Sequence, residues 1–347
     1  MSHGGGIGLP ELTPTKVAAY FHLDEGGAHC ELCPHQCLIL PGKEGRCGVR
    51  AYQEDQGLVS KSYGNASAIA LDPMEKKPLY HFYPGTTVLS LGSFGCNLRC
   101  RFCQNWQISQ KIQAADILTP EAVVELANKY QHVSCVGVAF TYNEPTIWYE
   151  FVLDTALLLQ AADLKTVLVT NGYISPEPWR ELLPRIDAVN IDVKGWSEEF
   201  YHKLCGGSLQ PVLDNVQTAR EYCHVELTYL VIPGHNDDDT SLEGFARWVR
   251  ERLGAATPVH FSRYFPNYRL DIPATPIATM KKARNIASEW LDYVYLGNVE
   301  VNGAAHTYCP VCHTLVIERS RFEAPRIYAS YGRCPDCGTT LPLITEA

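Results

Sequence analysis

Cysteines are the feature of this chain that most restricts what it can fold into. The 347 residues include 14 cysteines, and all but three of them fall into tight groups. The groups are Cys30, Cys33, Cys37 and Cys47; Cys96, Cys100 and Cys103; and Cys309, Cys312, Cys334 and Cys337. Clustered cysteines in a reducing compartment indicate metal ligation rather than disulfides. The remaining Cys135, Cys205 and Cys223 are expected to be small buried apolar residues.

The central group has the spacing C-x3-C-x2-C, from Cys96 to Cys103. Three thiolates this close can ligate three irons of a [4Fe–4S] cluster, whereas a cubane held by protein alone uses four cysteines. The fourth iron is then open to a small chelating ligand that offers an amine and a carboxylate. A zinc knuckle is the alternative, but it fits poorly because no fourth ligand stands nearby. The spacing therefore predicts a cluster with one open coordination position.

Between residues 86 and 304, short apolar runs alternate with helical patterns. The runs predict strands at 87–91, 136–140, 166–170, 188–192, 225–232, 259–262 and 293–296. Helices are predicted from Pro120, with Thr119 as the N-cap, and near 145–161, 176–183, 209–222, 242–253 and 277–290. This alternation predicts an α/β fold with a parallel sheet, either an open or partial (β/α) barrel or a doubly wound sheet. Residues 1–85 then form a Cys-rich N-terminal segment, and residues 305–347 form a separate C-terminal module.

Polar residues follow several of the predicted strands. They are Asn143 and Glu144, then Asn171, then Asp192 and Lys194. In (β/α) barrels the active site is formed by the loops at the carboxyl ends of the strands, so we expect these groups to surround the central cysteines. The alternative is ordinary turn and cap chemistry. Glu144, for example, precedes Pro145 and can cap the helix that starts there.

Longer motifs make the chain similar to a known family. They are Cys47-Gly-Val-Arg50, Asp72 to Gly85, Gly95-Cys-Asn97, Cys103-Gln-Asn-Trp106, Thr141-Tyr-Asn-Glu-Pro-Thr146, Ile232-Pro-Gly-His-Asn-Asp237, Tyr295-Leu-Gly-Asn298 and two C-terminal Cys-Pro-x-Cys motifs. Together with the central cysteine spacing, they resemble the AmmeMemoRadiSam system radical S-adenosylmethionine enzymes, relatives of the pyruvate formate-lyase activating enzyme. The resemblance covers about residues 28–338 and implies a partial (β/α)6-type radical S-adenosylmethionine barrel.

The resemblance also implies the cofactors and the residues that hold them. The cofactors are a [4Fe–4S] cluster and S-adenosylmethionine (SAM), which fills the open iron position. The residues are Cys96, Cys100 and Cys103 for the cluster, and Asn143, Glu144, Asn171, Asp192, Lys194 and His260 for SAM. Glu144 would accept a hydrogen bond from the amino group of SAM, Asn171 would lie near its ribose or carboxylate, and Lys194 would pair with the carboxylate.

The chain departs from the activating enzymes at two positions. Val169 stands where those enzymes carry aspartate, and Tyr142-Asn143 replaces a Gly-Gly pair before Glu144. These departures argue against a bound monovalent cation and against a glycyl radical activase. The resemblance implies one-electron cleavage of SAM to a 5′-deoxyadenosyl radical, which takes hydrogen from a small-molecule or protein substrate. It also implies a small electron donor protein, a flavodoxin or a ferredoxin.

The flanking cysteine groups predict further metal sites. Cys309, Cys312, Cys334 and Cys337 form two C-x2-C pairs that suit zinc or a rubredoxin-like single iron, as in a zinc-ribbon module. Cys30, Cys33, Cys37 and Cys47 suit a structural zinc or an auxiliary iron–sulfur cluster. The C-terminal module carries four arginines and four carboxylates, so it lacks the basic surface of a nucleic-acid binder.

Composition excludes some partners. The net charge of −9 argues against binding to nucleic acid or to an anionic membrane. No apolar run is long enough for a membrane span, and the N-terminal Met1–Gly6 lacks the features of a signal peptide, so we expect a cytoplasmic protein. Three functions remain: a radical SAM enzyme, a glycyl radical enzyme activase, and a non-catalytic iron–sulfur or zinc protein that carries electrons or recruits a partner.

Overall fold

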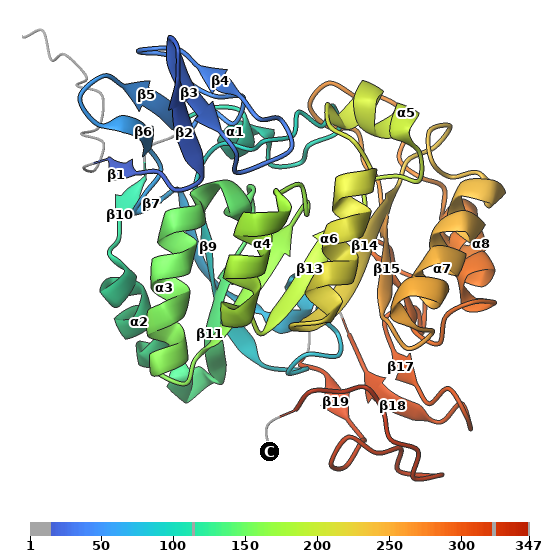
Figure 1. The fold of residues 1–347 in the computed structure, drawn as a ribbon. Coiled ribbons are helices and arrows are strands. Elements are labelled where there is room, and N and C mark those ends of the chain that lie inside the picture. Colours follow the sequence, from blue (N-terminus) through green and yellow to red (C-terminus); the bar gives the residue numbers. More distant parts are fainter. Residues whose placement is uncertain (1–14, 113–114, 321–323, 346–347) are drawn as a thin grey trace, which may run out of the picture.

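The computed structural model describes residues 15–112, 115–320 and 324–345. The N-terminal residues that bear on a signal peptide lie outside the described residues. An eight-stranded sheet forms the centre of the molecule (Figure 1), in the order β16-β15-β14-β13-β12-β11-β9-β8. Its strands are β8 (Ala68–Pro73), β9 (Thr87–Gly92), β11 (Cys135–Phe140), β12 (Lys165–Thr170), β13 (Ala188–Asp192), β14 (His224–Val231), β15 (Val259–Arg263) and β16 (Val294–Gly297).

Seven of these strands are the ones that the sequence predicts, and all seven run parallel. Each is hydrogen-bonded to the next strand in chain order, so the sheet grows in one direction only. A doubly wound sheet requires a point where the strand order reverses, so that alternative is wrong and the partial barrel is confirmed. The edge strands β8 and β16 are not paired with each other, which leaves the barrel open along one side.

The strand of the central sheet that the sequence analysis missed is β8. It pairs antiparallel with β9, and it places Asp72 opposite Val88. Most of its residues are partly or fully exposed, as is common for an edge strand, so its apolar pattern is weak. The central sheet therefore takes one strand from the segment 1–85, and the division at residue 85 stays a prediction.

Helices cover the outer face of the sheet (Figure 1). The long ones are α2 (Pro120–Lys129), α3 (Tyr149–Ala161), α4 (Pro176–Leu182), α6 (Gln210–Arg220), α7 (Asp239–Leu253) and α8 (Ile277–Ser288). The Thr119 hydroxyl accepts a hydrogen bond from the Ala122 N–H at 3.2 Å, which confirms the predicted N-cap of α2. The helix expected from residue 145 begins as a 3-10 turn at Pro145–Trp148 and continues as α3.

The N-terminal segment stands over the carboxyl ends of the barrel strands, at the top of Figure 1. It contains two antiparallel sheets with the orders β1-β6-β5 and β2-β3-β4. Their strands are β1 (Lys16–Val17), β2 (Phe21–Asp24), β3 (Gly27–Cys30), β4 (Leu38–Ile39), β5 (Arg50–Gln53) and β6 (Gly57–Ser60). A further pair joins β7 (Asn65–Ala66) to β10 (Asp116–Ile117), and the short helices α1 (Trp106–Ser109) and α5 (Glu198–Phe200) lie at this same end.

The C-terminal module lies at the opposite end of the barrel (Figure 1). It is a small antiparallel sheet of β17 (Thr307–Tyr308), β18 (Leu315–Glu318) and β19 (Arg326–Ile327). Within the described ranges of the chain, no helix is both long and apolar enough to cross a membrane.

Candidate active site

The central cysteine loop begins directly after β9, where the chain turns at the carboxyl end of the sheet. Gly95 makes this turn with a φ of +86°, and a Cβ atom there would lie 2.6 Å from the backbone oxygen of Cys47, so only glycine fits. Asn143 fixes the turn from the end of β11: its Oδ1 accepts from the Ser93 N–H at 2.9 Å, and its Nδ2 donates to the Gly95 carbonyl at 3.1 Å. Asn143 is therefore a positioning residue for the cysteine loop.

The three thiols of this loop are suited to metal binding. Burial raises the pKa of Cys96 and of Cys103. For Cys100, the neighbouring Cys205 thiol raises the pKa most, and burial adds to that effect. Thiols with a raised pKa stay protonated until a metal displaces the proton. Cys100 is buried, and Cys96 and Cys103 are partly buried. Three thiols on one short loop can reach one iron–sulfur cluster, and its binding would release their protons.

Cys205 is a neighbour of this site that the sequence analysis did not identify. It ends a π-helical turn at Tyr201–Cys205, and its carbonyl accepts from the Arg99 N–H at 2.7 Å. The Arg101 N–H donates to the Leu204 carbonyl at 2.9 Å, so this turn is attached on both sides of Cys100. Cys205 is fully buried, as expected. No local spacing could reveal its position, because it reaches the loop through the fold.

Glu144 is 2% exposed and accepts four hydrogen bonds. Its Oε1 accepts from the N–H and the hydroxyl of Thr146, at 2.9 and 2.8 Å, and from the Thr170 hydroxyl at 2.7 Å. Its Oε2 accepts from the Asn171 N–H at 2.8 Å. Burial raises the pKa of Glu144, and these hydrogen bonds oppose that rise. The helix-cap role is confirmed at Oε1, while Oε2 still has capacity for a second donor.

Asn171 follows β12 and contacts the cysteine loop directly. Its Nδ2 donates to Oδ1 of Asn97 at 2.9 Å and lies 3.7 Å from the sulfur of Cys96. Its Oδ1 accepts from the Tyr173 N–H at 2.8 Å. Hydrogen bonds to cysteine sulfurs are among the features that set the reduction potential of a cluster, so the structure places Asn171 where it can influence that potential.

Lys194 and Asp192 lie together at the end of β13. Nζ of Lys194 is 2.5 Å from Oδ2 of Asp192. Burial opposes the positive charge, but the negative charge of Asp192 outweighs it and raises the pKa of Lys194. Lys194 therefore stays charged beside Cys100, although Asp192 already accepts one of its hydrogen bonds. A ligand carboxylate would share this cation with Asp192.

The structure places His260 in a buried network around Glu226. Its Nε2 lies 2.6 Å from the carboxylate of Glu226, in β14, and its ring packs edge-on against Tyr80. The same carboxylate accepts from the N–H groups of Tyr80 and His81, at 2.9 and 2.7 Å. Glu226 had no recognisable motif around it, and this buried charge is what holds His260 inside the barrel.

His81 gives this network a testable pH dependence. Burial lowers the pKa of His81 to about 3, from an ordinary value of 6.5. Between these values the unfolded chain binds a proton at His81 and the folded chain does not, so the free energy of unfolding falls with falling pH, by up to about 1.4 kcal/mol per pH unit. Urea unfolding at about pH 7 and about pH 5 should show a smaller loss for His81→Gln than for the wild type. The exposed His132→Gln is the control, and equal losses in all three proteins would contradict the prediction.

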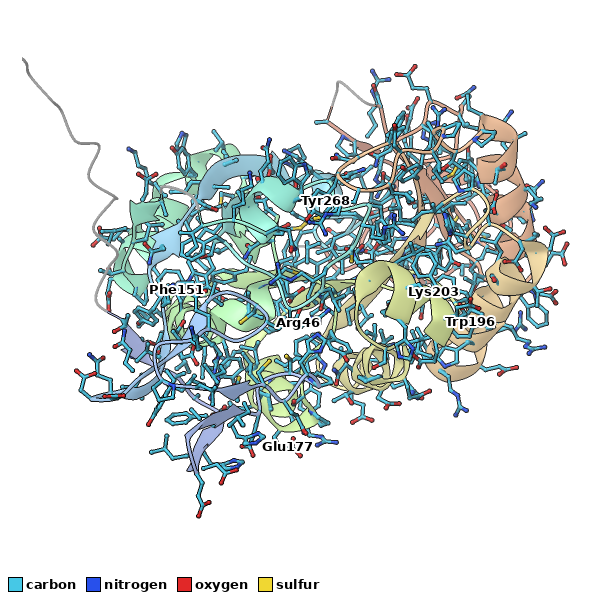
Figure 2. All side chains as sticks on the ribbon, turned by 90° about the horizontal axis from the view of Figure 1, so that it is seen from above. Arg46, Phe151, Glu177, Trp196, Lys203 and Tyr268 are labelled. Atoms are coloured by element: carbon cyan, nitrogen blue, oxygen red, sulfur yellow. The ribbon has the colours of Figure 1, made fainter. Side chains whose placement is uncertain are left out.

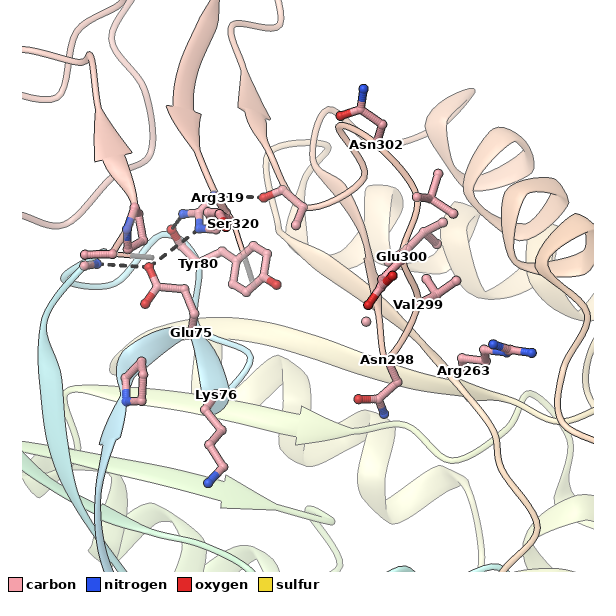
Figure 3. Close-up of a pocket in the computed structure, with 18 of the residues that line it drawn as sticks. Glu75, Lys76, Tyr80, Arg263, Asn298, Val299, Glu300, Asn302, Arg319 and Ser320 are labelled. Atoms are coloured by element: carbon pink, nitrogen blue, oxygen red, sulfur yellow. Dashed lines mark hydrogen bonds and ion pairs between the residues drawn. The ribbon is translucent and has the colours of Figure 1, made fainter. Parts of the chain in front are cut away.

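A pocket of about 1450 Å³ lies along the open side of the barrel (Figure 3). Glu75 and Lys76, which follow β8, line one wall, and residues 296–302, from β16 and the loop after it, line the other. Gln104, the residue after Cys103, also lines the pocket, so this space reaches the cysteine loop. Arg319 of the C-terminal module lines it too and donates to the Tyr80 carbonyl at 2.6 Å.

The C-terminal cysteines form a compact group. The four sulfur atoms of Cys309, Cys312, Cys334 and Cys337 all lie within 4.8 Å of one another. Thiolates on one tetrahedral zinc are about 3.8 Å apart, because each Zn–S bond is about 2.3 Å long. The sulfurs of Cys309 and Cys337 are separated by 3.6 Å, and those of Cys312 and Cys334 by 3.5 Å. This geometry fits the predicted zinc-ribbon-like module. The N-terminal cysteines, by contrast, line one small pocket near Gly95.

Known proteins resemble this chain in sequence and in fold. MJ0808, an uncharacterized protein of Methanocaldococcus jannaschii, is 43% identical over 335 residues, which are 94% of this chain and 98% of that protein. The pyruvate formate-lyase 1-activating enzyme of Escherichia coli K12 is 28% identical over 163 residues, which are 45% of this chain and 66% of the enzyme. Among solved structures, Streptococcus suis SuiB bound to S-adenosylmethionine has a TM-score of 0.50 at 10% identity, over 63% of this chain and 50% of that one; this is a likeness of fold alone.

The sequence profile of the Radical SAM superfamily matches residues 91–243. This stretch starts at the end of β9 and includes the cysteine loop and the strand ends that carry Glu144, Asn171 and Lys194. Because the profile covers the cysteine loop and these strand ends, this part of the chain is a domain of the radical SAM superfamily.

Proposed function

We propose that this chain is a radical SAM enzyme. It would cleave SAM reductively, and the 5′-deoxyadenosyl radical formed would abstract a hydrogen atom from a second substrate. One observation carries the proposal: the loop of Cys96, Cys100 and Cys103 lies among Glu144, Asn171 and Lys194, at the carboxyl ends of parallel strands. Active sites of barrels of this kind lie at that end. When bound, the cluster and SAM supply one-electron cleavage of the sulfonium to methionine and a 5′-deoxyadenosyl radical.

The residues of the chain would bind and orient these groups. Cys96, Cys100 and Cys103 would hold three irons. Oε2 of Glu144, which accepts one hydrogen bond from the described residues, would accept a second from the amino group of SAM. Lys194 would form ion pairs with both Asp192 and the SAM carboxylate. Buried side chains around the loop would keep water away from reactive species.

We propose that the substrate, a small molecule or a protein side chain, binds in the pocket along the open side of the barrel. The pocket is large, carries both charges and apolar groups, and reaches Gln104 beside Cys103. A flavodoxin or a ferredoxin would reduce the cluster. The C-terminal cysteines would hold zinc, which would stabilise that module.

The narrower family assignment is also a proposal. The motifs of the sequence support an AmmeMemoRadiSam system enzyme. A glycyl radical enzyme activase is the second candidate, favoured by the similarity to the activating enzyme of Escherichia coli over 45% of the chain. Co-purification of a glycyl radical protein, and formation of a glycyl radical on it, would favour the activase.

The deciding experiment is anaerobic reconstitution with ferrous iron and sulfide, followed by reduction in the presence of SAM. We expect methionine and 5′-deoxyadenosine to form in equal amounts. A non-catalytic iron–sulfur or zinc protein would instead form neither product and leave the cluster spectrum unchanged when SAM is added.

A substitution that fills the pocket tests the substrate site. Val299 lies on the wall opposite Lys76 (Figure 3). We expect Val299→Trp to leave SAM binding and basal 5′-deoxyadenosine formation unchanged, because Val299 is not among the residues proposed to hold the cluster or SAM. The stimulation of that reaction by a substrate-containing cell fraction should fall about tenfold or more. Val311→Trp, at a site 66% exposed on the C-terminal module, is the control; full stimulation in Val299→Trp would refute this location.

A further inference from the structure

The structure separates the three cysteine groups by the spacing of their sulfur atoms. The C-terminal four all lie within 4.8 Å of one another. In the part of the chain that the structure describes, no three cysteines of the N-terminal group or of the central loop have sulfur atoms that all lie this close to one another. The N-terminal group thus resembles the central loop, which belongs to a superfamily that binds [4Fe–4S] clusters, and it differs from the group with zinc geometry.

The spacing argues against a single metal ion at Cys30, Cys33, Cys37 and Cys47. Thiolates on one tetrahedral metal lie about 3.8 Å apart, so a mononuclear site would bring all four sulfurs together. A two-iron cluster places two thiolates on each iron, which would give two close pairs. Sulfur–sulfur hydrogen-bond contacts occur within the C-terminal group, and none is found among the described N-terminal cysteines. A cubane takes one thiolate on each iron, and its thiolates are therefore farther apart.

The four N-terminal cysteines nevertheless face one common space. All four line a single small pocket, together with Arg46, Arg50 and Ile147. The chain brings them there by short-range structure: Cys30 ends β3, and its N–H donates to the Cys37 carbonyl at 2.9 Å. Their approach to one pocket without close sulfur contacts is the arrangement that a polynuclear cluster requires.

Arg50 supplies a second observation that points to a ligand. Its side chain is 1% exposed and lines this pocket. Its Nη1 donates to the Ala19 carbonyl at 2.6 Å, and its Nη2 pairs with Glu150. Its Nε makes no hydrogen bond of good geometry among the described residues, and the Arg50 side chain lies against the Cys30 thiol. A buried donor without a partner is costly, and a cluster with four thiolates carries negative charge that such a donor can bind.

The pocket lies next to the central loop. The backbone oxygen of Cys47 packs against Gly95, and Nε2 of His35 lies 2.9 Å from the Asn97 carbonyl. Arg46 donates to the Gly206 carbonyl at 2.9 Å, and Figure 2 shows it near the middle of this end of the molecule. From this geometry we infer that Cys30, Cys33, Cys37 and Cys47 hold a second [4Fe–4S] cluster, beside the SAM-binding one. The inference does not depend on the proposed reaction.

Metal analysis of the full-length protein tests this inference. The protein and a variant with Cys96, Cys100 and Cys103 replaced by alanine are purified anaerobically and reconstituted with ferrous iron and sulfide. We expect about eight irons per chain in the wild type and about four in the variant, with about one zinc in each. The reduced variant should give the electron paramagnetic resonance signal of a [4Fe–4S] cluster, and SAM should not change it.

Adding Cys33→Ala and Cys47→Ala to that variant should remove the remaining iron, whereas adding Cys223→Ala, a half-buried cysteine outside the groups, should not. If the Cys33 and Cys47 changes prevent folding, the iron and zinc contents of the wild type still show whether the N-terminal cysteines hold a cluster or a zinc ion. A wild type with about four irons and two zinc ions per chain would overturn the inference. If only the response to SAM were missing, the proposed function would be contradicted, whereas the inference of a second cluster would stand.

Discussion

Replacing Cys100 by alanine is expected to abolish formation of 5′-deoxyadenosine and to remove about four irons per chain. Cys100 is buried, with Cys205 and Lys194 nearby, and its thiolate is one of the three proposed iron ligands. Iron analysis, the electron paramagnetic resonance signal of the reduced protein with and without SAM, and product chromatography measure the effect.

The metal at Cys309, Cys312, Cys334 and Cys337 should stay bound in this variant, because that site lies at the opposite end of the barrel (Figure 1). Cys223→Ala is the matched control and should keep both iron content and turnover. A SAM-responsive signal that persists in Cys100→Ala would show that the cluster is held elsewhere.

Replacing Glu144 by glutamine is expected to weaken SAM binding about 10- to 100-fold while the iron content stays unchanged. Glu144 is not among the proposed cluster ligands, and its Oε2 is the acceptor proposed for the amino group of SAM. The neutral amide also cannot accept all four of the hydrogen bonds that the carboxylate receives. We therefore expect the free energy of unfolding to fall by about 1–3 kcal/mol as well. Calorimetric SAM titration and thermal unfolding separate the two effects.

Two further variants make this result specific. Glu177→Gln changes an exposed carboxylate on α4 (Figure 2) and should alter neither the SAM affinity nor the free energy of unfolding. Lys194→Ala should also weaken SAM binding without loss of iron, because it removes the cation beside Asp192. Normal SAM affinity in both Glu144→Gln and Lys194→Ala would contradict the proposed SAM contacts. If Glu144→Gln then showed a stability loss alone, Glu144 would act only as a helix cap.

Local sequence patterns predicted the barrel and the central cysteine loop. A buried parallel strand is a continuous apolar run, whereas the apolar residues of a covering helix recur every three to four positions. The seven parallel strands and the N-cap at Thr119 could therefore be located from the sequence. The spacing of Cys96, Cys100 and Cys103 is likewise local, because the three ligands must reach one cluster from one short loop. The family resemblance then supplied roles for residues at the strand ends.

Tertiary structure alone decided the features that join distant segments. Strand β8 has a weak apolar pattern because it is an exposed edge, and its place is set by pairing with β9. Cys205 reaches Cys100 through a π-helical turn, and Glu226 draws His260 into the barrel interior because a buried carboxylate requires donors. The sequence identifies three groups of cysteines, but the distances between their sulfur atoms depend on how the backbone brings them together. Those distances distinguish the compact C-terminal group from the other two.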